Sequence, residues 1–178
     1  SHINTYIDMS TVKCRHNNGR ETARVLANHF QNNTMIDTIV CLDGTELIGA
    51  FMAEFLADTG IMSINSGKNI SIITPDVFMD STLRMIKHMQ VLVLAASVTT
   101  GQTITRAAEA VSYYGGTVRG VAAIFSNVEQ TAEGMEIFSI FQKEDLPDYQ
   151  AYLPSECPMC RKKMPIDAIV NSFGYSKL

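Results

Sequence analysis

Seven consecutive residues combine hydroxyl side chains with a glycine in a pattern suited to a phosphate ester. They are Ser97, Val98, Thr99, Thr100, Gly101, Gln102 and Thr103, and a stretch with helical spacing follows them. A turn that opens a helix directs backbone N–H groups and hydroxyls toward one point, in front of the positive end of the helix. Gly101 also lets the main chain approach a ligand that a Cβ would block. The turn therefore predicts a phosphate site, although threonines in such a turn also serve as simple helix caps.

The elements beside this turn determine where such a site would lie. The five apolar residues 91–95 predict a strand buried on both faces, as in a parallel sheet. Residues 102–114 predict a helix, which Gly115 and Gly116 end. In parallel α/β sheets, ligands bind beyond the carboxyl ends of the strands. The turn over 97–103 occupies that position.

The rest of the chain predicts more units of the same kind. We expect a helix over 19–33, a strand over 38–42 followed by a helix over 46–60, strand-like runs over 61–65 and 70–74, a buried strand over 117–126, a peripheral strand over 136–142 and a short helix over 166–172. This alternation predicts an α/β fold with a central, mostly parallel sheet flanked by helices on both faces. We expect one compact domain, made of an N-terminal segment (1–20), an α/β core (21–145) and a tail (146–178).

Composition limits the function classes. The chain has 178 residues, of which 46% are hydrophobic and 18% charged, and it has no apolar run near the length of a membrane span. Its 14 basic and 18 acidic residues give a net charge of −4, without the basic cluster that nucleic acids require. No secretory or transit signal is visible. Four cysteines, two of them in a Cys-x-x-Cys, fit a reducing compartment. We expect a cytoplasmic protein with neither a nucleic-acid nor a membrane partner.

Four stretches of the sequence resemble one enzyme family. "VLVLAASVTTGQTITRAAEAVSYYGG" resembles the phosphoribosyl pyrophosphate motif of type I phosphoribosyltransferases. "SHINTYIDMSTVKCR" resembles the amino-terminal hood of orotate phosphoribosyltransferases, and "CLDGTELIGAFMAEFLA" resembles their pyrophosphate loop and the helix after it. "CPMCRKKMPID" resembles the Cys-Pro-x-Cys end of some members. These stretches lie between residues 1 and 167, so the resemblance extends along most of the chain.

The resemblance implies a type I phosphoribosyltransferase fold, which is Rossmann-related, and a homodimer. It also implies transfer of phosphoribosyl from phosphoribosyl pyrophosphate to a nucleobase such as orotate, a step of pyrimidine biosynthesis, with pyrophosphate release and Mg²⁺ bound to the substrate oxygens. The resemblance places the 5′-phosphate at Ser97–Thr103, the pyrophosphate at Asp43, Gly44, Thr45 and Glu46, and the base near the hood residues Tyr6 and Asp8.

The chain departs from the family just before the turn. The family has an acidic pair there that faces the ribose hydroxyls, whereas this chain has Ala95 and Ala96. Losing one electrostatic contact of that kind typically costs about 2.7–4 kcal/mol of barrier. Asp43 and Glu46 offer carboxylates from another side, but acids that open a helix are often simple caps. Three alternatives stay open: an impaired enzyme, a non-catalytic binder or sensor of phosphoribosyl pyrophosphate or a nucleotide, and an interaction module.

A second departure concerns basic residues. Orotate phosphoribosyltransferases have a mobile loop with several basic residues that close over the pyrophosphate. Between residues 65 and 90 this chain has only Lys68, Arg84 and Lys87. Arg84 and Lys87 stand at helical spacing, which also fits a solvated helix face.

Cys157 and Cys160 have the spacing of half a zinc site. A structural zinc takes four ligands, and Cys14 with His16 offers a second half, unless a dimer supplies the Cys157 and Cys160 pair twice. The alternatives are a tight turn with two packed thiols and a redox pair, which would require a thioredoxin-like setting. A structural Zn²⁺ at these residues is therefore one expectation among three.

Overall fold

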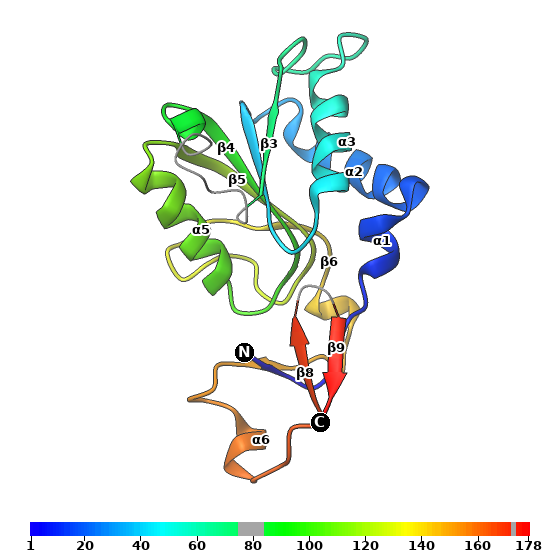
Figure 1. Cartoon of the computed structure of the whole chain (residues 1–178), viewed down its shortest axis with the longest axis vertical. Helices are drawn as coiled ribbons and strands as arrows, with labels where there is room; N and C mark the ends of the chain where they lie inside the picture. The colour runs from blue at the N-terminus through cyan, green and yellow to red at the C-terminus, as the bar shows by residue number, and fades with distance from the viewer. Residues whose placement is uncertain (75–83, 172–173) are drawn as a thin grey trace.

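A five-stranded parallel sheet forms the centre of the protein (Figure 1). The computed structural model describes residues 1–74, 84–171 and 174–178. The strands of the sheet are β2 (Thr38–Cys41), β3 (Ser71–Ile73), β4 (Gln90–Val98), β5 (Thr117–Ser126) and β6 (Phe138–Gln142). Their order is β3-β2-β4-β5-β6, and every neighbouring pair is parallel. The predicted α/β fold with a mostly parallel sheet is confirmed.

Helices cover both faces of the sheet, as the sequence predicts. The first face carries α1 (Ser10–Cys14), α2 (His16–Phe30) and α3 (Glu46–Ala57), and the second carries α5 (Gln102–Tyr113). Successive side chains of a strand point to opposite faces. Leu94 and Ala96 of β4 therefore pack with α2 and α3, whereas Val93 and Ala95 pack with α5. Ala95 and Ala96 thus face opposite sides of the sheet.

The N-terminal segment and the tail pair with each other, beside the end of the core (Figure 1). The strand β1 (His2–Ile3) is antiparallel to β7 (Ala151–Tyr152). Asn4 extends this pairing, because its side chain donates to the carbonyl of Asp148 (2.6 Å) and accepts from the N–H of Gln150 (2.7 Å). The tail begins after the 3₁₀ helix η3 (Lys143–Asp145) and includes α6 (Pro158–Arg161) and the antiparallel hairpin of β8 (Ala168–Asn171) and β9 (Gly174–Lys177). Residues from the two ends of the chain therefore form one unit.

Residues 61–65 form turns and bends where the sequence predicts a strand. Asn65 is buried there, and its side chain accepts from the N–H of Ile36 (2.8 Å) and donates to the carbonyl of Thr34 (2.9 Å). The hydroxyl of Ser63 donates to the carbonyl of Leu56 (2.7 Å). Polar side chains that bond to nearby backbone compete with the ladder of a sheet. The next predicted strand is present as β3, and the 3₁₀ helix η2 (Arg84–Ile86) lies shortly before β4.

The predicted helix over 166–172 is wrong, because β8 and β9 occupy this end of the chain. Ile169 and Val170 are β-branched, which favours extended backbone. They pair with Ser176 and Tyr175 across the hairpin. A short apolar run carries no periodicity that separates a strand from a helix.

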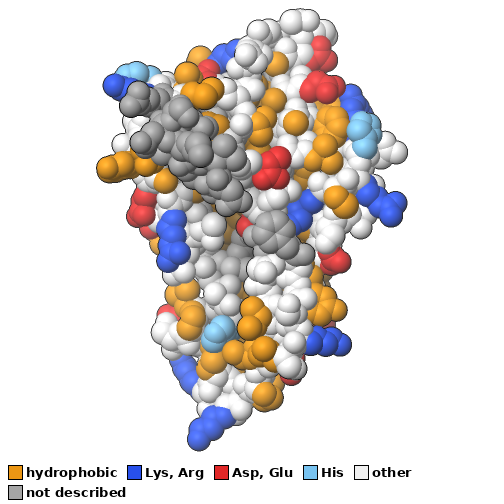
Figure 2. Space-filling model, in the orientation of Figure 1, with side chains coloured by type: hydrophobic (Ala, Val, Ile, Leu, Met, Phe, Trp, Pro, Cys, Tyr) orange, Lys and Arg blue, Asp and Glu red, His pale blue; other side chains and the backbone are white. Residues whose placement is uncertain are grey.

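The surface has no concentrated basic area on the face drawn in Figure 2, where Lys and Arg are scattered. Within the part of the chain that the structure describes, no helix combines the length and the apolar character needed to cross a membrane.

Candidate functional site

The predicted phosphate turn lies at the carboxyl end of β4, where α5 begins. Gly101 is the N-cap of α5, and its φ of 79° is in the left-handed region that favours glycine. A Cβ at Gly101 would stand 3.5 Å from Cα of the buried Thr131. That distance is an ordinary van der Waals contact, so it is the backbone conformation that favours glycine here. The N-cap has no side-chain hydrogen bond, which leaves the first N–H groups of α5 suited to an anion.

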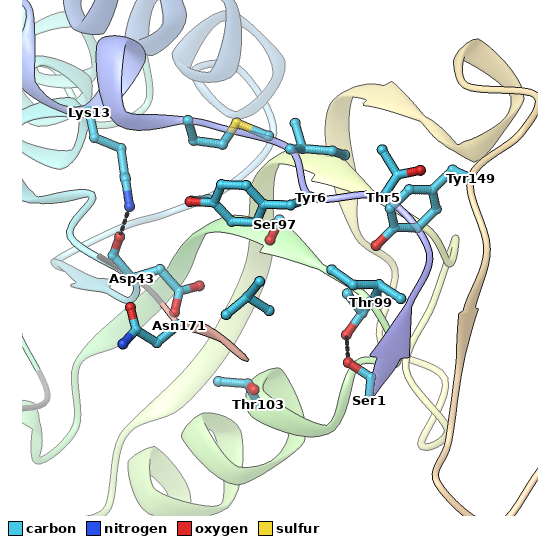
Figure 3. A pocket seen from close by; sticks show the side chains of 15 residues that line it. Ser1, Thr5, Tyr6, Lys13, Asp43, Ser97, Thr99, Thr103, Tyr149 and Asn171 are labelled. Atoms are coloured by element: carbon cyan, nitrogen blue, oxygen red, sulfur yellow. Dashed lines mark hydrogen bonds between the residues drawn. The ribbon is translucent and has the colours of Figure 1, made fainter. Parts of the chain in front are cut away.

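Two adjacent hollows meet at this turn. The smaller one measures about 30 Å³ and is lined by residues 97–104 together with Asp43 and Ala95. The larger one measures about 280 Å³ and lies between the sheet, the N-terminal segment and the tail (Figure 3). Four residues line both hollows, namely Asp43, Ser97, Thr99 and Thr103. A ligand with a phosphate in the small hollow therefore has room to extend into the large one.

The N-terminal segment forms one wall of the large cavity. Tyr6 lines this cavity, at the place where the resemblance puts the base, and its ring lies 5.4 Å from the ring of Tyr175 in β9. At the phosphate end, the hydroxyls of Ser1 and Thr99 are 3.0 Å apart (Figure 3). The wall thus contacts both the phosphate turn and the tail hairpin.

The turn after β2 forms the other end of the cavity. Asp43 and Gly44 both have positive φ, 58° and 74°. A non-glycine residue in this conformation costs of order 1–3 kcal/mol and is typical of ligand sites. The amine of Lys13, in α1, donates to the carbonyl of Asp43 at 2.9 Å (Figure 3). Lys13 therefore stabilises the strained turn and brings a positive charge to the cavity wall.

Two residues of the predicted pyrophosphate site, Thr45 and Glu46, do not line either hollow. Thr45 is fully buried, and its hydroxyl donates to the carbonyl of Leu42 (2.7 Å) and also lies 3.3 Å from the carbonyl of Leu94. Its side chain therefore links the turn to β4 and does not reach the cavity. Glu46 is exposed at the start of α3 and lines neither hollow. Burial, and then the charge of Glu46, raises the pKa of the Cys41 thiol to about 12, so Cys41 stays protonated.

Asp8 does not line either hollow. Its carboxylate accepts from the hydroxyl of Ser10 (2.5 Å) and from the N–H of Ser10 (2.8 Å), just before α1. These two hydrogen bonds lower the pKa of the Asp8 carboxyl below its ordinary value. Asp8 thus organises the start of α1, although the resemblance places it near the base.

Ala95 and Ala96 occupy different places at the site. Ala96 is 4% exposed and lines the large cavity, whereas Ala95 is 1% exposed and lines the small hollow from the side of α5. Among the described lining residues of both hollows, Asp43 is the one with a carboxylate. The wall where the family has acids is therefore apolar here.

The basic residues 68, 84 and 87 are not gathered at the cavity. Lys68 forms an ion pair with Asp37 at 2.8 Å, and the exposed Lys87 lies beside Gly115. Arg84 belongs to η2, and its side chain lies outside the described part of the structure. Neither described lysine lines the hollows.

The sequence did not indicate Tyr149, Val170 and Asn171 as lining residues, and it gave no separate role to Lys13 within the hood-like stretch. Lys13 is a single lysine in a polar stretch, and Val170 and Asn171 reach the cavity from a hairpin that was expected to be a helix. Tyr149 is buried against Phe125 (ring centroids 4.8 Å apart), and burial raises its pKa to about 12. A pattern of tyrosines in the tail was the one available signal, and it does not separate a core role from a ligand contact.

The Cys-x-x-Cys lies in the tail, where Cys157 precedes α6 and Cys160 belongs to it. Their thiols and the ring of His2 form a group whose ligand atoms lie within 4.8 Å of one another. Burial raises the pKa of the Cys157 thiol, but hydrogen bonds from the backbone of Cys160 and from the side chain of His2 outweigh it and lower the pKa to about 7. Cys14 and His16, the expected second half, are not members of this group. The ring of His16 packs on Phe51 instead (5.1 Å).

Comparison with known proteins gives one curated relative and many similar structures. No family model matches the sequence. Orotate phosphoribosyltransferase of Chlorobaculum parvum is 35% identical over 80 residues, which are 44% of this chain and 39% of that protein. The match thus spans well under half the length of the curated relative.

Solved structures extend the similarity of fold to most of the chain. Orotate phosphoribosyltransferase of Mycobacterium tuberculosis, in complex with Fe(III) dicitrate, has a TM-score of 0.60 at 19% identity and is matched over 79% of this chain and 82% of its own. The same enzyme in complex with 5-phospho-α-D-ribosyl 1-diphosphate gives 0.56 at 19% identity, over 80% and 83%. Adenine phosphoribosyltransferase of Thermoanaerobacter pseudethanolicus gives 0.58 at 16% identity, over 77% and 87%. The chain has the type I phosphoribosyltransferase fold, and its sequence is similar to an orotate phosphoribosyltransferase.

Proposed function

We propose that this chain is a phosphoribosyltransferase of the orotate type, which transfers phosphoribosyl from phosphoribosyl pyrophosphate to a nucleobase and releases pyrophosphate. One observation carries the proposal: the uncapped start of α5 lines a hollow that opens beside a cavity large enough for a sugar and a base. The similarity to orotate phosphoribosyltransferase supports the choice of base. Adenine phosphoribosyltransferases share the fold, so the choice of base needs a direct test.

The chain binds the 5′-phosphate through uncharged donors. The N–H groups at the start of α5 and the hydroxyls of Thr99 and Thr103 surround the small hollow. The aligned peptide dipoles of α5 favour a dianion at this end of the helix. Lys13 and the strained turn at Asp43 stand at the other end of the cavity, where the pyrophosphate would lie. The two phosphate-bearing ends of the substrate thus have separate contacts, and the ribose is held between them.

The base would lie against the N-terminal segment and the tail. Tyr6, Ile7 and Met9 offer aromatic and apolar surface, and Asn171 offers an amide that both donates and accepts. A planar pyrimidine with carbonyl and N–H groups is the kind of ligand that such a mixture accommodates.

The proposal includes Mg²⁺, which the family binds together with the substrate. Asp43 lines both hollows, and its carboxylate is a ligand of the type that Mg²⁺ prefers. One carboxylate with substrate oxygens and several waters is an ordinary ligand set for this ion. When bound, Mg²⁺ would neutralise charge on the departing pyrophosphate. Asp43 would hold the ion in place without the carboxylates that the family has at positions 95 and 96.

A second function is favoured by the two alanines. Positive charge that develops on the sugar ring during transfer finds no carboxylate at Ala95 or Ala96. The loss of one such contact costs about 2.7–4 kcal/mol, or roughly 10²–10³ in rate. A binder or sensor of phosphoribosyl pyrophosphate would need the phosphate contacts and not this stabilisation. The alternative is therefore a non-catalytic binder with the same ligand.

The test of ligand binding compares two threonines of α5, one that lines the hollows and one that does not. Thr103 lines both hollows, whereas the hydroxyl of Thr105 donates to Glu133 (2.6 Å) and lines neither. We expect Thr103→Ala to weaken phosphoribosyl pyrophosphate binding by roughly tenfold, as for one hydrogen bond to a charged group of about 1.5 kcal/mol. Thr105→Ala should leave the affinity unchanged. Calorimetry in the presence of Mg²⁺ measures both, and equal affinities for the two variants would contradict the assigned site.

The test of catalysis is pyrophosphate release with a panel of bases that includes orotate, uracil and adenine. Release with orotate alone supports the orotate-type enzyme, and release with adenine alone moves the substrate to the purines. If phosphoribosyl pyrophosphate binds but none of the bases leads to pyrophosphate release, the result supports the sensor.

Assembly is the last part of the proposal. A homodimer is implied by the resemblance, and exposed apolar side chains at Ile61, Met62 and Ile64 supply surface of the kind that a partner covers. Sedimentation velocity distinguishes a dimer from a monomer.

A further inference from the structure

We propose that His2, Cys157 and Cys160 bind one Zn²⁺ ion, which fastens the N-terminal segment to the tail and thereby holds one wall of the large cavity in place. This inference does not depend on the proposed function, because it concerns metal binding and chain order rather than turnover.

The three side chains have the chemistry and the spacing of a zinc site. Thiolate sulfur and imidazole nitrogen are the ligands that zinc prefers. Nδ1 of His2 lies 3.1 Å from Sγ of Cys160, and the ligand atoms of all three residues lie within 4.8 Å of one another. Tetrahedral coordination at the usual Zn–S and Zn–N lengths separates such atoms by about 3.5–3.8 Å. Side-chain rotations that shift the ligand atoms by about an ångström would therefore bring all three residues to one ion, with water as the fourth ligand.

The ligands come from opposite ends of the chain. His2 belongs to β1, and Cys157 and Cys160 flank the start of α6, more than 150 positions later. β1 is held to β7 by a two-residue ladder, and Asn4 adds hydrogen bonds to Asp148 and Gln150. A metal at His2 would hold β1 from the side opposite Asn4. The short pairing would then be fixed at both of its ends.

The tail needs such a link because it buries little apolar surface. Ile166, Ile169 and Leu178 are 60%, 59% and 76% exposed, and Figure 2 shows hydrophobic side chains on the surface of this part of the molecule. Small units without a sufficient core are usually stabilised by disulfides or by a structural metal. The structure records all four cysteines as free. A metal is therefore the cross-link that the residues at hand can supply.

The same link reaches the cavity. Ser1 and Ile3, on either side of His2, line it, and so does Tyr149, two positions before β7. A loose β1 would release Ser1 and Ile3 together with Tyr6, whereas Tyr149 stays packed on Phe125. Zinc binding would thus order the wall where the base is expected, without the ion touching the ligand.

The experiment uses the full chain, purified under reducing conditions, with its metal content and its Zn²⁺ affinity measured by competition with a chromogenic chelator. The variants are His2→Ala, Cys157→Ser and Cys160→Ser, and the matched control is Cys14→Ser with His16→Ala, the pair that the sequence suggested. We expect one Zn²⁺ per chain in the parent and in the control. Each ligand variant should bind more weakly by at least the roughly 10–100-fold that loss of an outer-shell partner costs.

Two further measurements protect the test against variants that misfold. Co²⁺ in the unmodified chain should give the thiolate charge-transfer and tetrahedral d–d bands of a Cys₂His site. Removing zinc from the unmodified chain should increase hydrogen exchange in residues 1–9 and 148–161 and leave the sheet unchanged. A chain that binds no Zn²⁺ with both thiols reduced would overturn the proposal, as would unchanged affinity in His2→Ala or loss of zinc in the control.

Discussion

At the scale of single residues, the candidate site has the hydroxyls and the glycine of the proposed phosphate turn, with alanines at positions 95 and 96. Thr99, Thr103 and Gly101 stand where the turn meets α5, and the apolar Ala96 faces the cavity beside them. In the proposed function, phosphate binding and charge stabilisation thus depend on different positions of one short stretch. A charge can therefore be introduced at position 96 without changing the residues proposed to bind phosphate.

Ala96→Asp should raise orotate turnover by at least about tenfold, because one contact to the developing charge is worth roughly 10²–10³ in rate. Ala96→Asn has nearly the same shape and no charge, and it should not raise turnover. Steady-state kinetics at saturating phosphoribosyl pyrophosphate measures both. Equal rates in the two variants would show that charge at this position has no effect on transfer.

Ala95→Asp should behave differently, since Ala95 lines the hollow of about 30 Å³ beside α5, whereas Ala96 lines the cavity of about 280 Å³, which has room for a carboxylate and its water. Burying an unpaired polar group there costs at least about 1–3 kcal/mol. Unfolding by urea should therefore show a larger loss of stability for this variant than for Ala96→Asp, and the reverse order would contradict the assigned directions of the two side chains.

At the scale of elements, Asp37 joins three segments at the amino end of the sheet. Its carboxylate accepts from Lys68 (2.8 Å) and from the N–H of Gln90 at the start of β4 (3.0 Å). Burial raises the pKa of the Asp37 carboxyl, but the hydrogen bonds from Lys68 and Gln90 and the charge of Lys68 lower it overall, below the ordinary 3.8. A lowered pKa in the folded state means that the ionised carboxylate stabilises the fold.

Asp37→Asn should cost about 1.5 kcal/mol at pH 7, the lower end for a hydrogen bond to a charged group, because the side chain is partly exposed. The contribution of Asp37 is complete above pH 3.8 and disappears as the pH falls through the lower folded-state pKa. The stability difference between parent and variant should therefore shrink as the pH is lowered from 5 to 2 in urea unfolding. The exposed Asp148→Asn serves as the control, and a difference that grows toward acid would contradict the assignment.

The elements also show how far sequence reasoning reaches. The strand over 117–126 is found at those bounds, and the turn before α5 lies at the predicted end of β4, because buried strands and glycine-ended helices leave clear local patterns. Thr45 and Asp8 have the expected positions in the chain, but hydrogen bonds to Leu42 and Leu94 bury the Thr45 side chain, and hydrogen bonds from Ser10 hold the Asp8 carboxylate away from the cavity. Lys13 and Asn171 reach the cavity through the packing of α1 and β8, which no local pattern encodes.

At the scale of the whole molecule, residues from both ends of the chain build one wall of the site. Asn4 is the main polar link in this wall, with two side-chain hydrogen bonds to residues 148–150. Each such bond contributes about 0.5–1.5 kcal/mol net. The polar links of the wall are therefore few, and its other anchors are apolar side chains, such as Ile3, Ile7 and Met9, that pack against the core on one face of the sheet.

Asn4→Ala should speed hydrogen exchange in residues 1–9 and 148–152 and leave the exchange of β4 and β5 unchanged. The exposed Asn32→Ala, beyond the end of α2, is the matched control. Exchange measured by mass spectrometry reports both regions in one experiment. Faster exchange throughout the sheet would mean that the wall and the core unfold together.

The buried hydroxyl of Thr45 has a consequence for selectivity. Because it joins the turn after β2 to β4, the two places proposed for the charged ends of the ligand keep a fixed separation. Compounds with two anionic groups at that spacing should all gain affinity, whatever group they carry between the anions and the hood. If the proposed function holds, discrimination among bases would depend on the wall, so a change in its hydrogen bonds would alter which base is accepted while the common part of the ligand continues to bind.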